Sequence, residues 1–125
     1  MRFVSRKHGI AVITAALLMA VSTSSMAHAK LQNSVPAADA SLKTAPKSIR
    51  IAFNEKLEPA FSSIRLRTVQ GANIATPKAI VDSADRKVMT LALPALQPQQ
   101  YQVDWTAVTV DGHRVKSGYK FSIVK

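Results

Sequence analysis

Apolar residues recur at every second position in five stretches of the chain, which is the spacing of strands that bury one face. No stretch between them shows helical spacing. Prolines, glycines and aspartates separate the stretches at short intervals, which is typical of a sandwich or barrel of short strands. The five sets are Ile49, Ile51 and Phe53; Ile64 and Leu66; Met89, Leu91 and Leu93; Tyr101, Val103, Trp105 and Ala107; and Tyr119, Phe121 and Ile123.

A proline-bearing turn at Leu96 to Gln100 precedes Tyr101, which opens the fourth of these strands. This arrangement is typical of the tyrosine corner of Greek-key sandwiches, in which the hydroxyl bonds back to the chain a few residues upstream. We therefore expect an all-β, immunoglobulin-like Greek-key β-sandwich of about seven strands. Trp105 and Met89 lie on the apolar faces of their strands, so we expect both in the core.

Residues 1–27 have the three zones of a secretory signal peptide: a basic start, an apolar stretch from Ile10 to Val21, and a short run of small and polar residues. The apolar stretch is shorter than the roughly 20 residues that a membrane span needs, so we do not expect a membrane-embedded protein. Small residues permit cleavage before His28 and equally before Lys30. The expected organisation is a cleaved signal, 1–27, and one exported domain, 28–125.

The exported domain contains no cysteine, so a packed core has to supply its stability without disulfides. Loss of the three basic residues in the signal reduces the net charge from +10 to +7. Such a surface attracts anionic lipid head groups or other polyanions. The basic residues never form a run in the sequence, and export also argues against nucleic acid. We therefore expect a solvated basic surface and no nucleic-acid partner.

Two histidines remain after removal of the signal, His28 and His113, and neither falls on an apolar face of a predicted strand. An N-terminal histidine offers one metal ion its free α-amine and a ring nitrogen, and both bind in their neutral forms. Asp111-Gly112-His113 adds a carboxylate and an imidazole between a strand ending near Val110 and one beginning near Ser117. Three nitrogens and one oxygen favour copper(II) over the other common divalent metals, with zinc second.

Other interpretations of these residues stay open at this point. Asp-Gly is a common hairpin-turn dipeptide, so Asp111 and Gly112 are also consistent with a turn that binds nothing. A catalytic triad is disfavoured, because the exported domain has no cysteine and no serine in a nucleophile motif. Its three glycines do not form a phosphate-binding loop. We therefore expect no catalytic residues.

Six motifs follow one another along the exported domain. They are His28-Ala29-Lys30-Leu31, Ser34-Val35-Pro36-Ala37, Phe53-Asn54-Glu55, Tyr101-Gln102-Val103-Asp104-Trp105, Val110-Asp111-Gly112-His113 and Gly118-Tyr119-Lys120-Phe121-Ser122. In this order they resemble the CopC domain of the copper resistance protein C family, in particular its short periplasmic members. The most specific part is the Tyr-x-Val-x-Trp strand followed by Asp-x-His, together with an exported N-terminal histidine.

The resemblance implies a copper(II) site formed by the terminal amine and ring of His28, the carboxylate of Asp111 and the ring of His113. Glu55 matches a family glutamate that lies at or near the metal, and we include it as a further candidate ligand. Many relatives carry a methionine-rich loop for copper(I). The corresponding stretch here, Arg67 to Lys78, contains no methionine, so we expect binding of copper(II) only.

One further departure concerns Arg114, which stands where a proline often follows the family histidine. The function implied by the resemblance is that of a periplasmic copper carrier or buffer in copper homeostasis or resistance. We expect no enzyme, because a metal held by four or more protein donors lacks an open position for chemistry. We expect a monomer whose copper passes to an inner-membrane copper transport protein or another periplasmic copper protein.

Two alternatives belong to other functional classes. A copper monooxygenase with an N-terminal histidine brace is disfavoured, because Asp111 would fill the position that such enzymes keep open. Few aromatic residues remain to form its flat sugar-binding face. The second alternative is a metal-free, immunoglobulin-like interaction module in which Asp111 and Gly112 form only a turn.

Overall fold

The computed structural model describes residues 29–125, so the predicted signal peptide, 1–27, and the candidate ligand His28 lie outside the described residues. Every regular element in this range is a strand, and none of it is a helix long and apolar enough to span a bilayer. The strands are β1 (Leu31–Val35), β2 (Ser41–Leu42), β3 (Ser48–Phe53), β4 (Ser63–Thr68), β5 (Ile80–Val81), β6 (Val88–Ala92), β7 (Gln100–Val108) and β8 (Arg114–Ile123).

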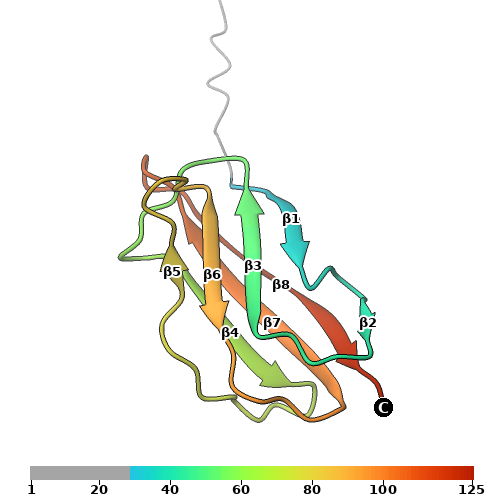
Figure 1. Cartoon of the computed structure of the whole chain (residues 1–125). Coiled ribbons are helices and arrows are strands. Elements are labelled where there is room, and N and C mark those ends of the chain that lie inside the picture. The colour runs from blue at the N-terminus through green and yellow to red at the C-terminus, as the bar shows by residue number, and fades with distance from the viewer. Residues whose placement is uncertain (1–28) are drawn as a thin grey trace, which may run out of the picture.

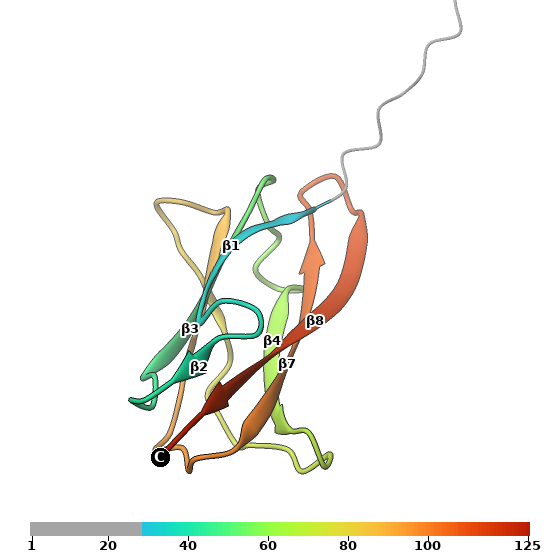
Figure 2. The same ribbon diagram turned by 90° about the vertical axis from the view of Figure 1, so that its right-hand side faces the viewer.

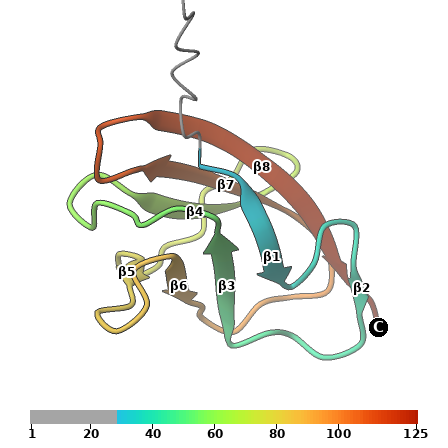
Figure 3. The same ribbon diagram turned by 90° about the horizontal axis from the view of Figure 1, so that it is seen from above.

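The strands form two four-stranded sheets, ordered β1-β3-β6-β5 and β2-β8-β7-β4 (Figure 1). Neighbouring strands are antiparallel except β2 and β8, which pair in parallel. Figure 3 shows β4, β7 and β8 in one layer and β3, β5 and β6 in the other. The predicted all-β sandwich is confirmed. The structure has eight strands rather than about seven. Two of them, β2 and β5, are only two residues long and too short to show alternation in the sequence.

The core lies between the sheets and contains the apolar residues that the alternation selected. All five predicted sets are buried, except that Leu93 lies just beyond β6 and is only partly buried. Trp105 of β7 packs edge-on against Phe53 of β3, with ring centroids 5.0 Å apart, and so joins the two sheets. Met89 is completely buried, and both Met89 and Trp105 are confirmed as core residues.

Tyr101 forms the predicted tyrosine corner. Its hydroxyl donates a hydrogen bond of 2.7 Å to the carbonyl oxygen of Gln97, four residues upstream. Its ring stacks on Phe121 of β8, with centroids 5.5 Å apart. The corner therefore fixes the beginning of β7 to the preceding loop and to the neighbouring strand.

The boundaries predicted around the candidate site were wrong by a few residues. The strand β7 ends at Val108 rather than near Val110, and β8 begins at Arg114 rather than near Ser117. Val115 explains the longer strand, because it packs against the core and pairs with Ala107. The connection between the two longest strands is therefore a loop of only five residues, 109–113.

Candidate metal centre

Backbone hydrogen bonds close the loop of residues 109–113 on itself. The Thr109 amide donates to the His113 carbonyl oxygen at 2.9 Å, and the Gly112 amide donates to the Thr109 carbonyl oxygen at the same distance. Gly112 has a φ of 91°, in the left-handed region where a side chain is strained. The glycine thus permits a turn tight enough to bring residues 111 and 113 to the same side.

The buried hydroxyl of Thr109 forms hydrogen bonds to two other residues of this loop. Thr109 is only 3% exposed. Its Oγ1 donates to Asp111 Oδ1 and accepts the backbone amide of His113 at 3.2 Å. Sequence reasoning did not identify Thr109. The available signal was a threonine two residues before an aspartate, a spacing at which hydroxyl groups form local hydrogen bonds.

Asp111 and His113, the two predicted loop ligands, are in direct contact. Asp111 Oδ2 lies 3.1 Å from His113 Nδ1, and both side chains remain partly open to solvent. The hydrogen bond from the Thr109 hydroxyl, followed by the neighbouring His113, holds the pKa of the Asp111 carboxyl below its usual range. Asp111 is therefore ionised at neutral pH and available as an anionic oxygen donor.

The beginning of the described chain is attached to the end of β3 by Asn54. The backbone amide of Lys30 donates to Asn54 Oδ1 at 2.7 Å, and the Asn54 amide donates to the Lys30 carbonyl oxygen at 3.1 Å. Ala29 is 3% exposed and belongs to the core. These contacts fix the chain two residues after His28.

The segment after Asn54 then reaches the candidate loop. Val110 donates its amide to the Lys56 carbonyl oxygen at 3.2 Å, and Leu57 forms a bridge with Thr109. The loop, the segment 54–58 and the first described residues therefore meet at one end of the sandwich, where β3 and β7 end and β8 begins (Figures 1 and 2). Residues separated by about 80 positions in the sequence are brought together by these backbone contacts.

Glu55 lies in this segment and is partly buried. Among residues 29–125, however, no three histidine, cysteine, aspartate or glutamate side chains gather closely enough to hold one metal ion. Asp111 and His113 thus form a pair of two donors. The role of Glu55 as a metal ligand stays a prediction. An imidazole nitrogen beside a carboxylate oxygen suits borderline divalent ions such as copper(II) and zinc. Further donors have to come from outside this pair.

The chain belongs to the CopC domain family, which matches residues 31–124. The resemblance predicted from the sequence is thereby confirmed. Protein YobA of Escherichia coli strain K12 is 37% identical over 120 residues, which cover 95% of this chain and 94% of that protein. Copper resistance protein C of Escherichia coli is 35% identical over 123 residues, which cover 90% of this chain and 94% of that protein.

A solved structure has the same fold. The crystal structure of CopC from Methylosinus trichosporium OB3b is similar with a TM-score of 0.74 and 28% sequence identity. The similarity covers 78% of this chain and 94% of that one. The β-sandwich is therefore shared with a CopC protein along almost the whole length of that molecule.

Proposed function

We propose that this protein binds one copper(II) ion through the α-amine and ring of His28, the carboxylate of Asp111 and the ring of His113. It would act as a carrier or buffer of copper in the periplasm, with Glu55 as an additional candidate ligand. The observation that carries the proposal is the 3.1 Å contact between Asp111 Oδ2 and His113 Nδ1, which joins a carboxylate and an imidazole. Membership of the CopC domain family and the name of the relative copper resistance protein C support copper as the ion.

The contacts of Asn54 support His28 as the partner of this pair. Asn54 fixes Lys30, and the two residues back to His28 span about 7 Å at most when extended. The neighbouring Lys56 carbonyl oxygen accepts the amide of Val110, which directly precedes Asp111. These contacts support the proposal that the terminal amine of a mature chain beginning at His28 would reach the loop.

The available donors favour copper(II) over copper(I). Copper(I) prefers soft sulfur ligands. The sequence has no cysteine, and the only methionine after the predicted signal is Met89, which is completely buried in the core. Nitrogen and oxygen donors remain, and these suit copper(II) in a tetragonal arrangement.

Native mass spectrometry of the exported protein with about one equivalent of copper(II) tests the proposal, because it reports the mature N-terminus and the stoichiometry together. We expect a mass that begins at His28 and gains one tightly held copper ion. A mass that begins at Lys30 would contradict the ligand set, as would a protein from His28 onward that retains no copper.

Three variants test the individual donors. His113→Ala and Asp111→Asn should each weaken copper(II) binding by roughly a hundredfold or more, because the first removes a nitrogen donor and the second replaces an anionic oxygen donor by a neutral one. Asp39→Asn is the matched control, since Asp39 is exposed in a distant turn and asparagine tolerates its positive φ. One alanine added before His28 removes the free α-amine from that residue while the folded domain stays the same. Unchanged affinity in this extended protein would exclude the terminal amine as a ligand.

Oxygen consumption with ascorbate distinguishes the carrier from a copper monooxygenase. A carrier shows no sustained copper-dependent turnover, whereas the enzyme does. The metal-free module predicts a third result, in which His113→Ala and the parent protein take up copper equally poorly. Each alternative therefore has an outcome that the carrier proposal does not allow.

A further inference from the structure

The outer face of the sheet β2-β8-β7-β4 gathers basic side chains that are dispersed in the sequence. Alternation along β4 and β8 directs five of them outward on either side of β7. Cross-strand pairing aligns them in rows, with Gln102 of β7 between Arg67 and Lys120. We call these residues the basic face: Arg65, Arg67, Arg114, Lys116 and Lys120.

One acidic residue, Asp104 of β7, lies at an outward position of these three strands, and both of its carboxylate oxygens already accept hydrogen bonds from neighbouring side chains. Its Oδ2 accepts a hydrogen bond from Arg67 Nε at 2.6 Å, and its Oδ1 accepts one from Gln102 Nε2 at 3.1 Å. Within the described part of the chain no other ion pair involves the basic face. Four of the five cations of the basic face therefore form no ion pair with another described residue.

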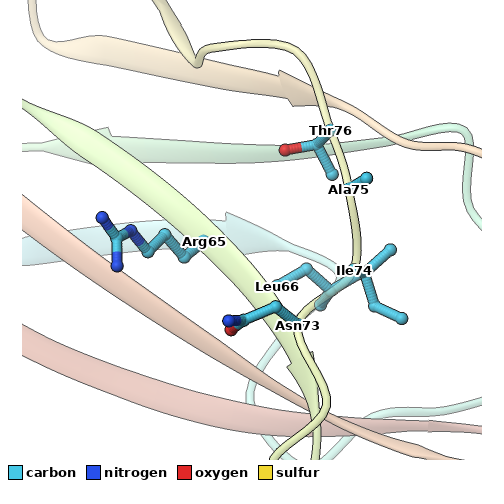
Figure 4. A pocket seen from close by; sticks show the side chains of 6 residues that line it. All are labelled: Arg65, Leu66, Asn73, Ile74, Ala75 and Thr76. Carbon is cyan, nitrogen blue, oxygen red and sulfur yellow. The ribbon is translucent and has the colours of Figure 1, made fainter.

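The basic face is hollowed around Arg65. A depression of about 320 Å³ is lined by Arg65, Lys116 and Asp104 together with the hydroxyls of Ser63 and Thr106. Arg65 also borders a second hollow of about 380 Å³ along the outer edge of β4, and Figure 4 shows Thr76 on the segment across from it. A guanidinium, an ammonium and two hydroxyls can all donate hydrogen bonds to a carboxylate, while the two oxygens of Asp104 already accept hydrogen bonds from Arg67 and Gln102.

We propose that the basic face is a docking surface for an acidic polypeptide segment of a protein partner, one of whose carboxylates enters the depression between Arg65 and Lys116. The charge of the face and the donors in the depression complement a run of aspartate or glutamate side chains. The docking requires no metal ion and does not depend on the proposed copper function.

The shape and composition of the face favour a polypeptide over a lipid surface. The sheet is twisted (Figure 2), so a flat bilayer contacts only part of the basic face at once, whereas an extended chain follows the strands. The large exposed apolar side chains, Val35, Phe61, Ile80, Val110 and Val124, all lie off the outward positions of β4, β7 and β8. No large exposed apolar side chain therefore lies within the basic face itself, as a membrane-binding surface of this kind would need.

The basic face also adjoins the candidate loop, because Arg114 directly follows His113. A docked partner would lie beside Asp111 and His113. Only this consequence rests on the proposed copper function, so the docking is tested without copper.

The test uses the exported protein and a fluorescent peptide of about twelve alternating glutamates and serines. Binding is measured by fluorescence anisotropy at about 0.1 M salt, where charges further apart than a Debye length are screened. The test variant is Arg65→Glu with Lys116→Glu. Its matched control, Lys43→Glu with Lys47→Glu, makes the same change of net charge in the connection between β2 and β3.

We expect the test variant to bind the peptide at least about tenfold more weakly, and the control to change affinity by less than about twofold. Arg65→Gln with Lys116→Gln gives the same answer if charge reversal disturbs folding. Equal losses in test and control variants would overturn the proposal, because net charge alone would then explain binding. Vesicles of phosphatidylglycerol and phosphatidylethanolamine provide the second comparison. Binding to them through Arg65 and Lys116, without peptide binding, would identify a lipid surface and overturn the polypeptide proposal.

Discussion

Replacement of Thr109 by valine tests how the candidate loop is held. Valine has nearly the same shape, so the change removes the hydroxyl without opening a cavity. The backbone amide of His113 loses its acceptor at 3.2 Å, and Asp111 loses the bond that most lowers its pKa. The amide bond alone contributes about 1 kcal/mol, which corresponds to a melting temperature lower by about 4–8 °C in a domain of this size.

The pH dependence separates the contribution of Asp111 from that of the amide. A carboxyl whose pKa is lowered by folding stabilises the protein above its unfolded value, and this stabilisation disappears as the pH falls through the folded value. The difference in melting temperature between parent and Thr109→Val should therefore be larger at about pH 6 than at about pH 3.

Circular dichroism of the metal-free proteins measures both melting temperatures, and Thr109→Ser is the control. Serine keeps the hydroxyl and loses only a buried methyl group, so its effect should be the same at both pH values. If Thr109→Val has no effect at about pH 6, or if its effect has the same pH dependence as that of Thr109→Ser, the Thr109 hydroxyl does not hold the loop through Asp111.

Two further predictions concern the attachment of the N-terminal segment by Asn54 and the close approach of β8 to β7 at Gly118. Asn54→Ala should weaken copper(II) binding by about tenfold, because the Lys30 amide loses its acceptor; Asn33→Ala, at an exposed position of β1, should leave the affinity unchanged in a competition titration. Gly118→Ala should reduce the free energy of unfolding in urea by about 1–3 kcal/mol, because the added Cβ would lie 2.5 Å from the Val103 carbonyl oxygen. Ser117→Ala, the adjacent position on β8, should change it by less than about 0.5 kcal/mol.

The strands that carry the core were predictable because alternation is a local property of the chain. Ile49, Ile51 and Phe53 repeat at the period of a strand, and the rule that one face is buried is enough to assign them to the core. The tyrosine corner was predictable for a related reason, since Tyr101 and its acceptor Gln97 are only four residues apart. In contrast, β2 and β5 contain two residues each and exist only through pairing with β8 and β6.

The sequence by itself determined the sandwich, its core and the residue types of the candidate site, because these follow from local alternation and from the donor chemistry of Asp111 and His113. Only the tertiary structure decided how the site is held. The hydroxyl of Thr109 lies under the loop, and Asn54 attaches the N-terminal segment beside the 54–58 turn. The basic face likewise arises from the order of strands within a sheet. The Asn54 contact and the basic face join residues far apart in the chain, so no local pattern records them, whereas Thr109 lies only two and four residues from its partners.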